Sequence, residues 1–410
     1  MMFLLLALSG PGAPCPSSSL PLREYRVDFG ESILEFSIKF AFGRVKGRFN
    51  AANGIILYDE ASPEHSSITL VIETNSLDTG WGHRDQHLRT SDFFDVEKFP
   101  TIVFQSRRIS QTSDGWIAEG DLSMHGHTKS MTLPFQFTQP PLRSPDSRWM
   151  IMHMAGAVRL ARADFDITGG ATYNSWFDKA RAATMGDSVD VSYEVGAYST
   201  DAASQRSPRI LAVLEQIKTD GVQAYITKLR DLQRTKTAQE FAPYRVGIDL
   251  VTRALIGDCR LPDAVALSQA MTELFPESHS PRLAHAFVLD LRGDKRGAAA
   301  EYAKAKVLFR PPVRDPNEKF PLVDDNWWYA DQLVRTALEW GYREQALRLA
   351  RTLAELYPQQ ARALTTYGQT LAATGDARGA AATYDQALQV DGREAGAIEW
   401  KRRLIAPGSN

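Results

Sequence analysis

The chain has 410 residues, which is enough for about two or three domains with separate hydrophobic cores. With 43% hydrophobic and 23% charged residues, its composition is that of an ordinary globular protein. The formal net charge of −2 argues against a nucleic-acid-binding protein, which usually carries a basic patch. Two cysteines, Cys15 and Cys259, are too few for a disulfide framework or a cysteine zinc site. They lie far apart in the sequence, one in a leader-like segment and one in a helical segment, so we expect no bridge between them.

Residues 1–20 predict a secretory leader. An apolar run from Met1 to Leu8 is followed by small residues and prolines, although the basic residues of a standard leader are missing. The run is too short to cross a bilayer, so no transmembrane span is expected. We therefore expect a periplasmic or secreted protein; a cytoplasmic protein with a disordered or wrongly assigned start is the alternative.

Residues 24–198 show a sequence period of two, which indicates β-strands with one apolar face. Apolar and polar residues alternate most clearly in the runs Leu34–Phe40, Ile68–Ile72, Met131–Phe137 and Val189–Val195. Turn-forming residues separate the runs. Many strands at this spacing predict a sandwich or an up-and-down barrel, and a closed barrel of about eight strands can hold one small apolar ligand.

The most informative segment is RDQHLRTSDFFDVEKFPTIVFQS, from Arg84 to Ser106. A charged turn that contains a histidine runs into Phe93 and Phe94, and a Phe-Pro step then leads into an alternating strand. By its residues alone, this segment predicts a rim that feeds a strand of a barrel or sandwich.

The same segment resembles the signature of the YceI-like family of lipocalin-like barrels. Matches to that family occur in order at 24–49, 75–104, 119–135, 162–167 and 186–195, where EGDLSMHGHTKSMTLPF and RADFDI are examples. The resemblance implies an antiparallel lipocalin-like β-barrel over residues 24–198 that holds a polyisoprenoid or isoprenoid-quinone-type lipid. Such binding needs no catalytic group, because burial of a hydrocarbon is favourable by about 25 cal/mol per Å² of apolar area.

The resemblance also indicates which residues would contact the lipid. The apolar pore is expected from Phe36, Ile38, Phe40, Leu70, Ile72, Phe93, Phe94, Ile102, Phe104, Leu133 and Phe135. The polar rim is expected from Arg84, Asp85, His87 and Arg89. Arginine suits a phosphate or pyrophosphate head group at such a rim.

Some of these residues have a plainer interpretation. The phenylalanines could equally belong to the core, since core and pore both require an inward apolar residue. Arg84 and Asp85 could form a structural ion pair that fixes the turn. His83 and His87 have a spacing that could ligate a metal, but no carboxylate or cysteine completes a recognisable zinc pattern. We expect no metal and no cofactor apart from the isoprenoid lipid as ligand.

Residues 199–209 predict a linker, and residues 210–405 switch to helical patterns. An internal repeat relates Ala346 to Ala380 and Ala264 to Ala298 by the same step, about 34 residues, and resembles the tetratricopeptide (TPR) repeat. Each unit of such a repeat leaves an apolar face that only a neighbour can cover, so the units stack into a solenoid. The sequence therefore predicts a multidomain β + α protein, in which a barrel is followed by a TPR-like α-helical solenoid.

We find no sequence pattern of an enzyme, such as a nucleophile elbow, a P-loop or a zinc-protease motif. The expected function is non-catalytic lipid binding in the barrel, while the helical repeats dock a partner protein. The alternative is a TPR-type interaction scaffold whose barrel is a packed structural module.

Overall fold

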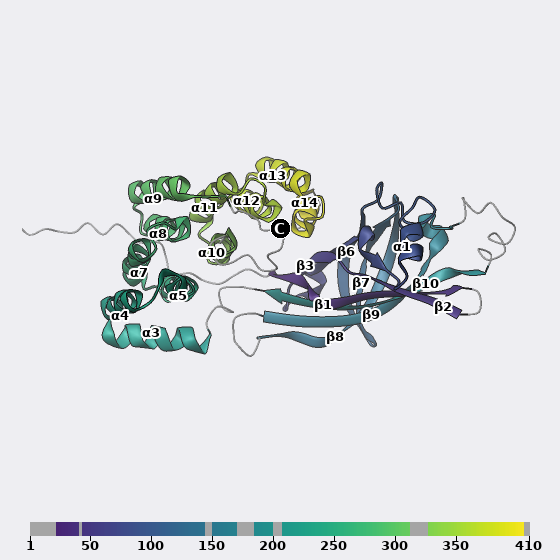
Figure 1. Ribbon diagram of the computed structural model, residues 1–410, viewed down its shortest axis with the longest axis horizontal. Helices are drawn as coiled ribbons and strands as arrows, with labels where there is room; N and C mark the ends of the chain where they lie inside the picture. Colours follow the sequence, from purple (N-terminus) through teal and green to yellow (C-terminus); the bar gives the residue numbers. More distant parts are fainter. Residues whose placement is uncertain are drawn as a thin grey trace, which may run out of the picture. The chain divides into compact units, whose positions relative to one another are not determined.

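The computed structural model describes residues 22–40, 43–143, 150–169, 184–199, 207–311 and 327–405. The leader expected at 1–20 and most of the linker expected at 199–209 lie outside them. The described chain forms two compact units, which are treated separately below (Figure 1). The barrel unit comprises residues 22–199 and 391–405, and the helical unit comprises residues 207–390.

The barrel unit is built on one antiparallel sheet. Its strands are β1 (Arg23–Phe40), β2 (Gly43–Phe49), β3 (Ala52–Tyr58), β4 (Ser67–Glu73), β5 (Leu77–Asp78), β6 (Thr101–Thr112), β7 (Gly115–Met124), β8 (His127–Arg143), β9 (Met150–Ala161) and β10 (Met185–Ser199). Its helical segments are η1 (Pro63–His65), η2 (Thr74–Ser76), α1 (Gly82–Leu88), η3 (Arg162–Phe165) and α14 (Ala395–Ile405).

The sheet closes on itself. The strand order is β10-β9-β8-β7-β6-β4-β3-β1-β2-β5, and an additional pairing between β10 and β1 closes a barrel of eight strands. The long strand β1 makes this possible, because its first residues pair with β3 and its later residues pair with β2 and β10. The predicted antiparallel barrel followed by a helical region is confirmed.

Close contact between neighbouring strands limits the side chains at some positions. A Cβ atom on Gly156 of β9 would lie 2.1 Å from the carbonyl oxygen of Pro134 and 2.5 Å from the hydroxyl of Tyr193. Glycine is therefore required where β9 passes between β8 and β10. The inward residues of the strands form one hydrophobic core, in which Tyr25 and Met152 are fully buried.

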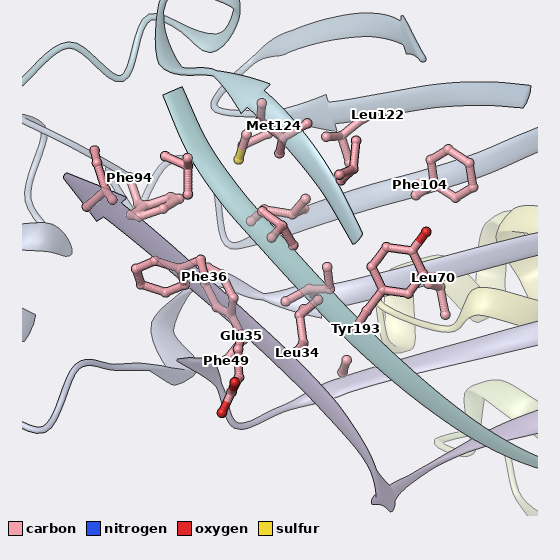
Figure 2. A pocket seen from close by; sticks show the side chains of 18 of the residues that line it. Leu34, Glu35, Phe36, Phe49, Leu70, Phe94, Phe104, Leu122, Met124 and Tyr193 are labelled. Carbon is pink, nitrogen blue, oxygen red and sulfur yellow. The ribbon is translucent and has the colours of Figure 1, made fainter. Parts of the chain in front are cut away.

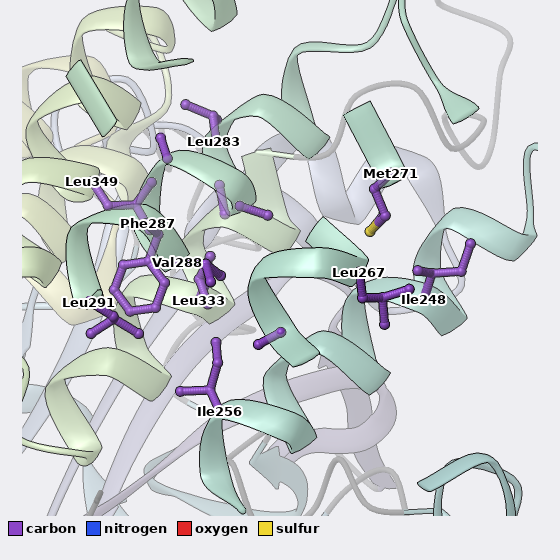
Figure 3. Packing of buried hydrophobic residues seen from close by; sticks show 14 of the residues in the cluster. Ile248, Ile256, Leu267, Met271, Leu283, Phe287, Val288, Leu291, Leu333 and Leu349 are labelled. Carbon is purple, nitrogen blue, oxygen red and sulfur yellow. The ribbon is translucent and has the colours of Figure 1, made fainter. Parts of the chain in front are cut away.

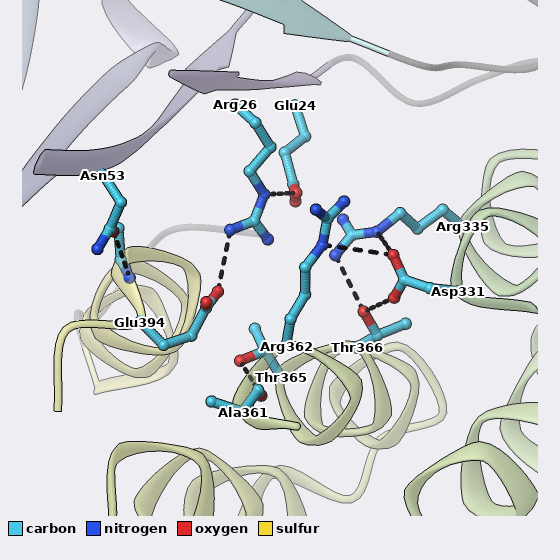
Figure 4. Close-up of polar contacts among 11 residues, drawn as sticks. Glu24, Arg26, Asn53, Asp331, Arg335, Ala361, Arg362, Thr365, Thr366 and Glu394 are labelled. Carbon is cyan, nitrogen blue, oxygen red and sulfur yellow. Dashed lines mark hydrogen bonds and ion pairs between the residues drawn. The ribbon is translucent and has the colours of Figure 1, made fainter. Parts of the chain in front are cut away.

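The last helix, α14, belongs to the barrel unit. Its Ala395 is buried in a cluster with Ile55 and Leu57 of β3 and Val71 of β4. Polar contacts lie beside this cluster. Arg26 of β1 donates hydrogen bonds to Glu24 and to Glu394, which directly precedes α14, both at 2.9 Å (Figure 4). The helical region that the sequence predicts over 210–405 thus ends in a helix that packs on the barrel.

The helical unit is a succession of helices of similar length. They are α3 (Pro208–Asp220), α4 (Val222–Thr235), α5 (Ala238–Phe241), α6 (Tyr244–Gly257), α7 (Leu261–Leu274), α8 (His279–Leu291), α9 (Lys295–Leu308), α10 (Trp327–Glu339), α11 (Arg343–Leu356), α12 (Ala361–Ala373) and α13 (Ala377–Val390). Helices α10 and α12 begin at Trp327 and Ala361, and the same step separates the starts of α7 and α9 and those of α11 and α13. Two neighbouring helices therefore form one repeat.

The repeats share a continuous core. Phe287 of α8 is fully buried in a cluster that also contains Leu333 of α10 and Leu349 of α11 (Figure 3). Cys259, which follows α6 with a left-handed backbone (φ 60°), is disulfide-bonded. The expectation that no bridge joins the two cysteines also involves Cys15, which lies outside the described residues. None of the described helices is long and apolar enough to cross a membrane.

Candidate functional site

The barrel encloses a cavity of about 570 Å³ (Figure 2). All eight strands of the closed barrel contribute side chains to its wall, and β2 and α1 add further residues. The wall is predominantly apolar because inward and outward residues alternate along each strand. Its volume lies in the range of sites that hold one small ligand, about 300–1,000 Å³.

Every residue that the sequence predicts for the pore lies in the wall of this cavity. These residues are Phe36, Ile38, Phe40, Leu70, Ile72, Phe93, Phe94, Ile102, Phe104, Leu133 and Phe135. Ile102 and Phe104 are also nearly fully buried members of the core. Core and pore are therefore not exclusive alternatives here, because the same inward side chain supports the fold on one side and faces the cavity on the other.

Aromatic rings form the wall near α1. Phe36 of β1 lies 5.7 Å from Phe49 of β2, and Phe49 lies 5.8 Å from Phe94 in an edge-to-face arrangement, measured between ring centroids. Such tilted and perpendicular geometries are the favoured ones for aromatic pairs. The three rings link β1, β2 and the segment after α1 into one apolar surface.

The expected polar rim is only partly at the cavity. Arg84 and His87 of α1 line it. Arg84 donates hydrogen bonds to the hydroxyl and the carbonyl of Thr79, at 2.7 and 2.9 Å, and its guanidinium lies 5.4 Å from the centroid of the Trp81 ring. The Nε2 atom of His87 is 2.9 Å from a carboxylate oxygen of the buried Asp92.

The other two predicted rim residues do not line the cavity. Asp85 is buried and accepts hydrogen bonds from the main-chain nitrogen of Thr79, at 3.0 Å, and from its hydroxyl. Arg89 donates hydrogen bonds to the main-chain carbonyls of Asn75 and Leu77. Both side chains therefore hold the connection from β5 to α1. Arg84 and Asp85 meet at Thr79, and no direct ion pair joins them among the described residues.

Sequence reasoning missed one charged residue in the wall, Arg162 at the start of η3. Its Nε atom donates to the carbonyl of Gly186, and its Nη1 atom donates to the carbonyls of Ile167 and Thr168, all at 2.8 Å. Burial lowers the pKa of Arg162, against the opposing effect of the Asp187 charge. Arg162 opens the RADFDI segment, but nothing in that segment says that its first side chain faces a cavity.

Sequence reasoning also missed apolar wall residues on β9 and β10, of which Val158, Leu160, Val189 and Val191 are examples. The alternation of β10 was visible in the sequence and could have identified its two valines. Tyr193 of β10 lies in the wall as well and donates a 2.6 Å hydrogen bond to the carbonyl of Pro134. Burial raises the pKa of Tyr193, so its phenol stays neutral.

The described residues contain no group of three or more His, Cys, Asp or Glu side chains that could hold a metal ion. The histidines of the barrel have other contacts. His87 contacts Asp92, and the Nδ1 atom of His125 lies 2.9 Å from the carbonyl oxygen of Phe165. The arrangement in this part of the chain is thus an apolar cavity with a few basic side chains.

Residues 25–197 match the YceI-like domain family. The UPF0312 protein YE1254 of Yersinia enterocolitica is 34% identical over 137 residues, which make up 33% of this chain and 71% of that protein. Among solved structures, BcnA of Burkholderia cenocepacia is 20% identical, with 42% of this chain and 98% of that chain covered and a TM-score of 0.36. A polyisoprenoid binding domain from Saccharophagus degradans, implicated in plant cell wall breakdown, is 16% identical, with coverages of 43% and 98% and a TM-score of 0.31.

Proposed function

The chain belongs to the YceI-like family through residues 25–197, and on this premise we propose that its barrel binds a polyisoprenoid or isoprenoid-quinone-type lipid without catalytic chemistry. The observation that carries the proposal is the apolar cavity of about 570 Å³ inside a closed barrel. The hydrocarbon would lie among the eleven predicted pore residues, and its polar end would lie near Arg84 and His87.

The hydrophobic effect alone supplies the affinity that such binding requires. Burial of one CH₂ group is favourable by about 0.8 kcal/mol, so an isoprene unit of about five carbons contributes about 4 kcal/mol at most. Ordering of the flexible chain and loss of its free motion offset part of this gain. A closed barrel adds little further cost from ordering of the protein, because its wall is already formed before the lipid enters.

Titration of the full-length chain tests the proposal. The chain is stripped of lipid by organic extraction and refolding, checked by circular dichroism, and titrated with geranylgeraniol and with a short-chain isoprenoid quinone. Saturable binding of one molecule per barrel, with a negative heat-capacity change, is the expected result. A folded barrel that takes up neither probe would contradict the proposal.

We also propose that the helical unit is a TPR-like array that docks a partner protein. Its support is the constant step between the starts of equivalent helices, together with the close packing of Tyr384 of α13 on Gly368 of α12. Reciprocal affinity capture with the full-length chain tests this idea. The chain as bait should recover one protein in near-equimolar amount, and that protein as bait should recover the chain. Failure to recover a common protein in both directions would contradict this role of the helical unit.

The domain limits and the compartment are part of the same proposal. We place the lipid-binding barrel at 24–198 with α14 packed on it, the linker at 199–209 and the array at 210–390, and we place the protein in the periplasm or outside the cell. The leader resemblance of residues 1–20 supports that compartment. Mass spectrometry of the N-terminus of the native protein tests it, because an exported chain should have lost its first residues, whereas an intact Met1 would contradict export.

A further inference from the structure

Arg162 is held in one orientation at the wall of the cavity. Its Nε and Nη1 atoms donate three hydrogen bonds, all at 2.8 Å, to the main-chain carbonyls of Gly186, Ile167 and Thr168. A guanidinium has five N–H donors, of which two belong to Nη2. Among the described residues, the Nη2 atom has no acceptor, so two donors of a fixed and half-buried guanidinium remain for another group.

The positive charge of Arg162 is not neutralised by a carboxylate within ion-pair distance in the described part of the chain; Asp187 acts on it from farther away. Two exposed arginines of the barrel, Arg159 and Arg107, differ in this respect. Arg159 of β9 contacts Asp190 at 2.6 Å, and Arg107 of β6 contacts Asp121 at 2.6 Å. A partly desolvated cation without a carboxylate partner favours a negative or strongly accepting oxygen nearby.

Arg162 lies at the α1 end of the barrel. A Cβ atom on Gly169 would be 2.7 Å from the ring of Phe93, so the segment after η3 touches that ring. Phe93 in turn lies 5.2 Å from the ring of His87 in α1. Arg162 and Arg84 are thus basic residues of the cavity wall that belong to the same end.

The rest of the cavity offers a place for a hydrocarbon tail. Figure 2 shows Phe36, Phe49 and Phe94 on one side of the cavity, and Leu70 and Phe104 on the other. The main-chain nitrogen of Phe94 donates a hydrogen bond to the carbonyl of Leu88 at the end of α1, 3.1 Å away, so the side of Phe94 is the α1 end. Tyr193 is the polar side chain drawn near Leu70, and its hydroxyl is already bonded to the carbonyl of Pro134.

Building on the proposed lipid function, we propose that Arg162 binds the head group of the lipid through its Nη2 atom, and that the lipid lies with its head at the α1 end and its tail toward Leu70 and Phe104. The required chemistry is an oxygen acceptor at one end of a prenyl chain. A phosphate ester and a quinone both supply it, and a plain hydrocarbon does not.

Three probes separate these possibilities on the full-length chain: geranylgeranyl phosphate, a short-chain isoprenoid quinone, and the hydrocarbon squalene. The binding constant of each is measured for the unchanged chain and for Arg162→Gln, Arg162→Lys and the control Arg159→Gln, which alters an exposed arginine on β9. Two of the probes, the phosphate and the quinone, carry an oxygen head group and are called the headed probes. The Arg162→Gln change should weaken the binding of one headed probe about tenfold or more and leave the binding of squalene unchanged. Arg162→Lys should recover part of the loss for a phosphate, and Arg159→Gln should change nothing.

The headed probe that loses affinity identifies the head group, as an anion for the phosphate or as a neutral oxygen for the quinone. Equal affinity of Arg162→Gln and the unchanged chain for both headed probes would overturn the inference while squalene binding upholds the lipid function. If no probe binds the unchanged chain, the lipid function itself fails. If Arg162→Gln does not fold, the unchanged chain decides: a preference of less than about threefold for each headed probe over squalene would overturn the inference.

Discussion

The carboxylate of Glu399 accepts a hydrogen bond from the hydroxyl of Thr69, 2.8 Å away, although the two residues are 330 positions apart in the sequence. The same carboxylate accepts a 2.7 Å hydrogen bond from Ser67 and is balanced by Arg402 and Arg403 of its own helix. Glu399 is fully buried. Helix α14 is therefore part of the barrel unit, and a barrel cut at residue 198 would lack this helix.

Glu399→Gln should destabilise the barrel unit by about 2 kcal/mol, because charge-assisted hydrogen bonds are replaced by neutral ones. Burial acts to raise the pKa of Glu399, but the hydrogen bonds and charge of Arg402, with Ser67 and Arg403, outweigh burial and lower it from the ordinary 4.5. The stabilisation is thus complete above pH 4.5 and is lost as the pH falls through the lowered folded-state pKa.

Denaturant unfolding of the full-length chain at pH 7 and at pH 3 measures both effects. Glu399→Gln should lower the free energy of unfolding more at the higher pH, whereas Glu64→Gln, which changes an exposed residue of η1, should have no effect at either. A Glu399→Gln variant as stable as the unchanged chain at pH 7 would show that this network does not hold the helix.

Removal of residues 391–410 should destabilise the barrel in a different way. Ile55, Leu57 and Val71 are fully buried in the cluster with Ala395, and truncation would expose them to water. An exposed apolar patch on a sheet promotes association. Size-exclusion chromatography should show self-association of the truncated chain, and its barrel should melt at a lower temperature. A monomeric truncated chain with an unchanged melting temperature would contradict the assignment of α14 to the barrel.

Leu133→Trp should reduce the amount of lipid that the barrel holds, because the larger side chain enters the cavity. The neighbouring Thr132 is exposed and points outward, so Thr132→Trp is the matched control. We expect affinity for geranylgeraniol to fall at least about tenfold in Leu133→Trp and to stay unchanged in the control. Equal binding by the two variants would mean that the lipid does not occupy this cavity.

Gly368→Ala should destabilise the helical unit by about 1–3 kcal/mol through overpacking. Its new Cβ atom would lie 2.4 Å from the ring of Tyr384, which is almost completely buried. Gly247 of α6 provides the opposite case, because nothing lies within 4 Å of a Cβ atom there. Gly247→Ala should stabilise the helix by about 1 kcal/mol, since alanine is the better helix former. Thermal melts that move in the same direction for both variants would refute this packing.

The alternation of side chains explains why residues of the cavity wall could be predicted. A period of two fixes which residues of a strand face inward, so Phe36 and Leu133 could be assigned without knowledge of the partner strands. The rim lies on a helix, where residues three or four apart share a face. Arg84 and His87 are three apart and line the cavity, whereas Asp85 and Arg89 are four apart and turn away from it.

Two features could not be predicted from local pattern. Arg162 follows a strand in a short 3-10 helix, and only the closed barrel brings its side chain to the cavity wall. Helices α10, α12 and α14 begin at Trp327, Ala361 and Ala395, so equal numbers of residues separate their starts. By its position in the sequence, α14 would therefore be the first helix of the next repeat. Ala395 nevertheless packs on β3 and β4, because the partner of an apolar helix face is decided by the tertiary fold.

Native mass spectrometry of the full-length chain, purified from its own source without detergent, tests the central claim most directly. The account predicts one isoprenoid-containing molecule per chain, released and identified by organic extraction and absent from Leu133→Trp. A folded chain that is empty, and that takes up neither a prenyl alcohol nor an isoprenoid quinone when these are added, would contradict lipid binding.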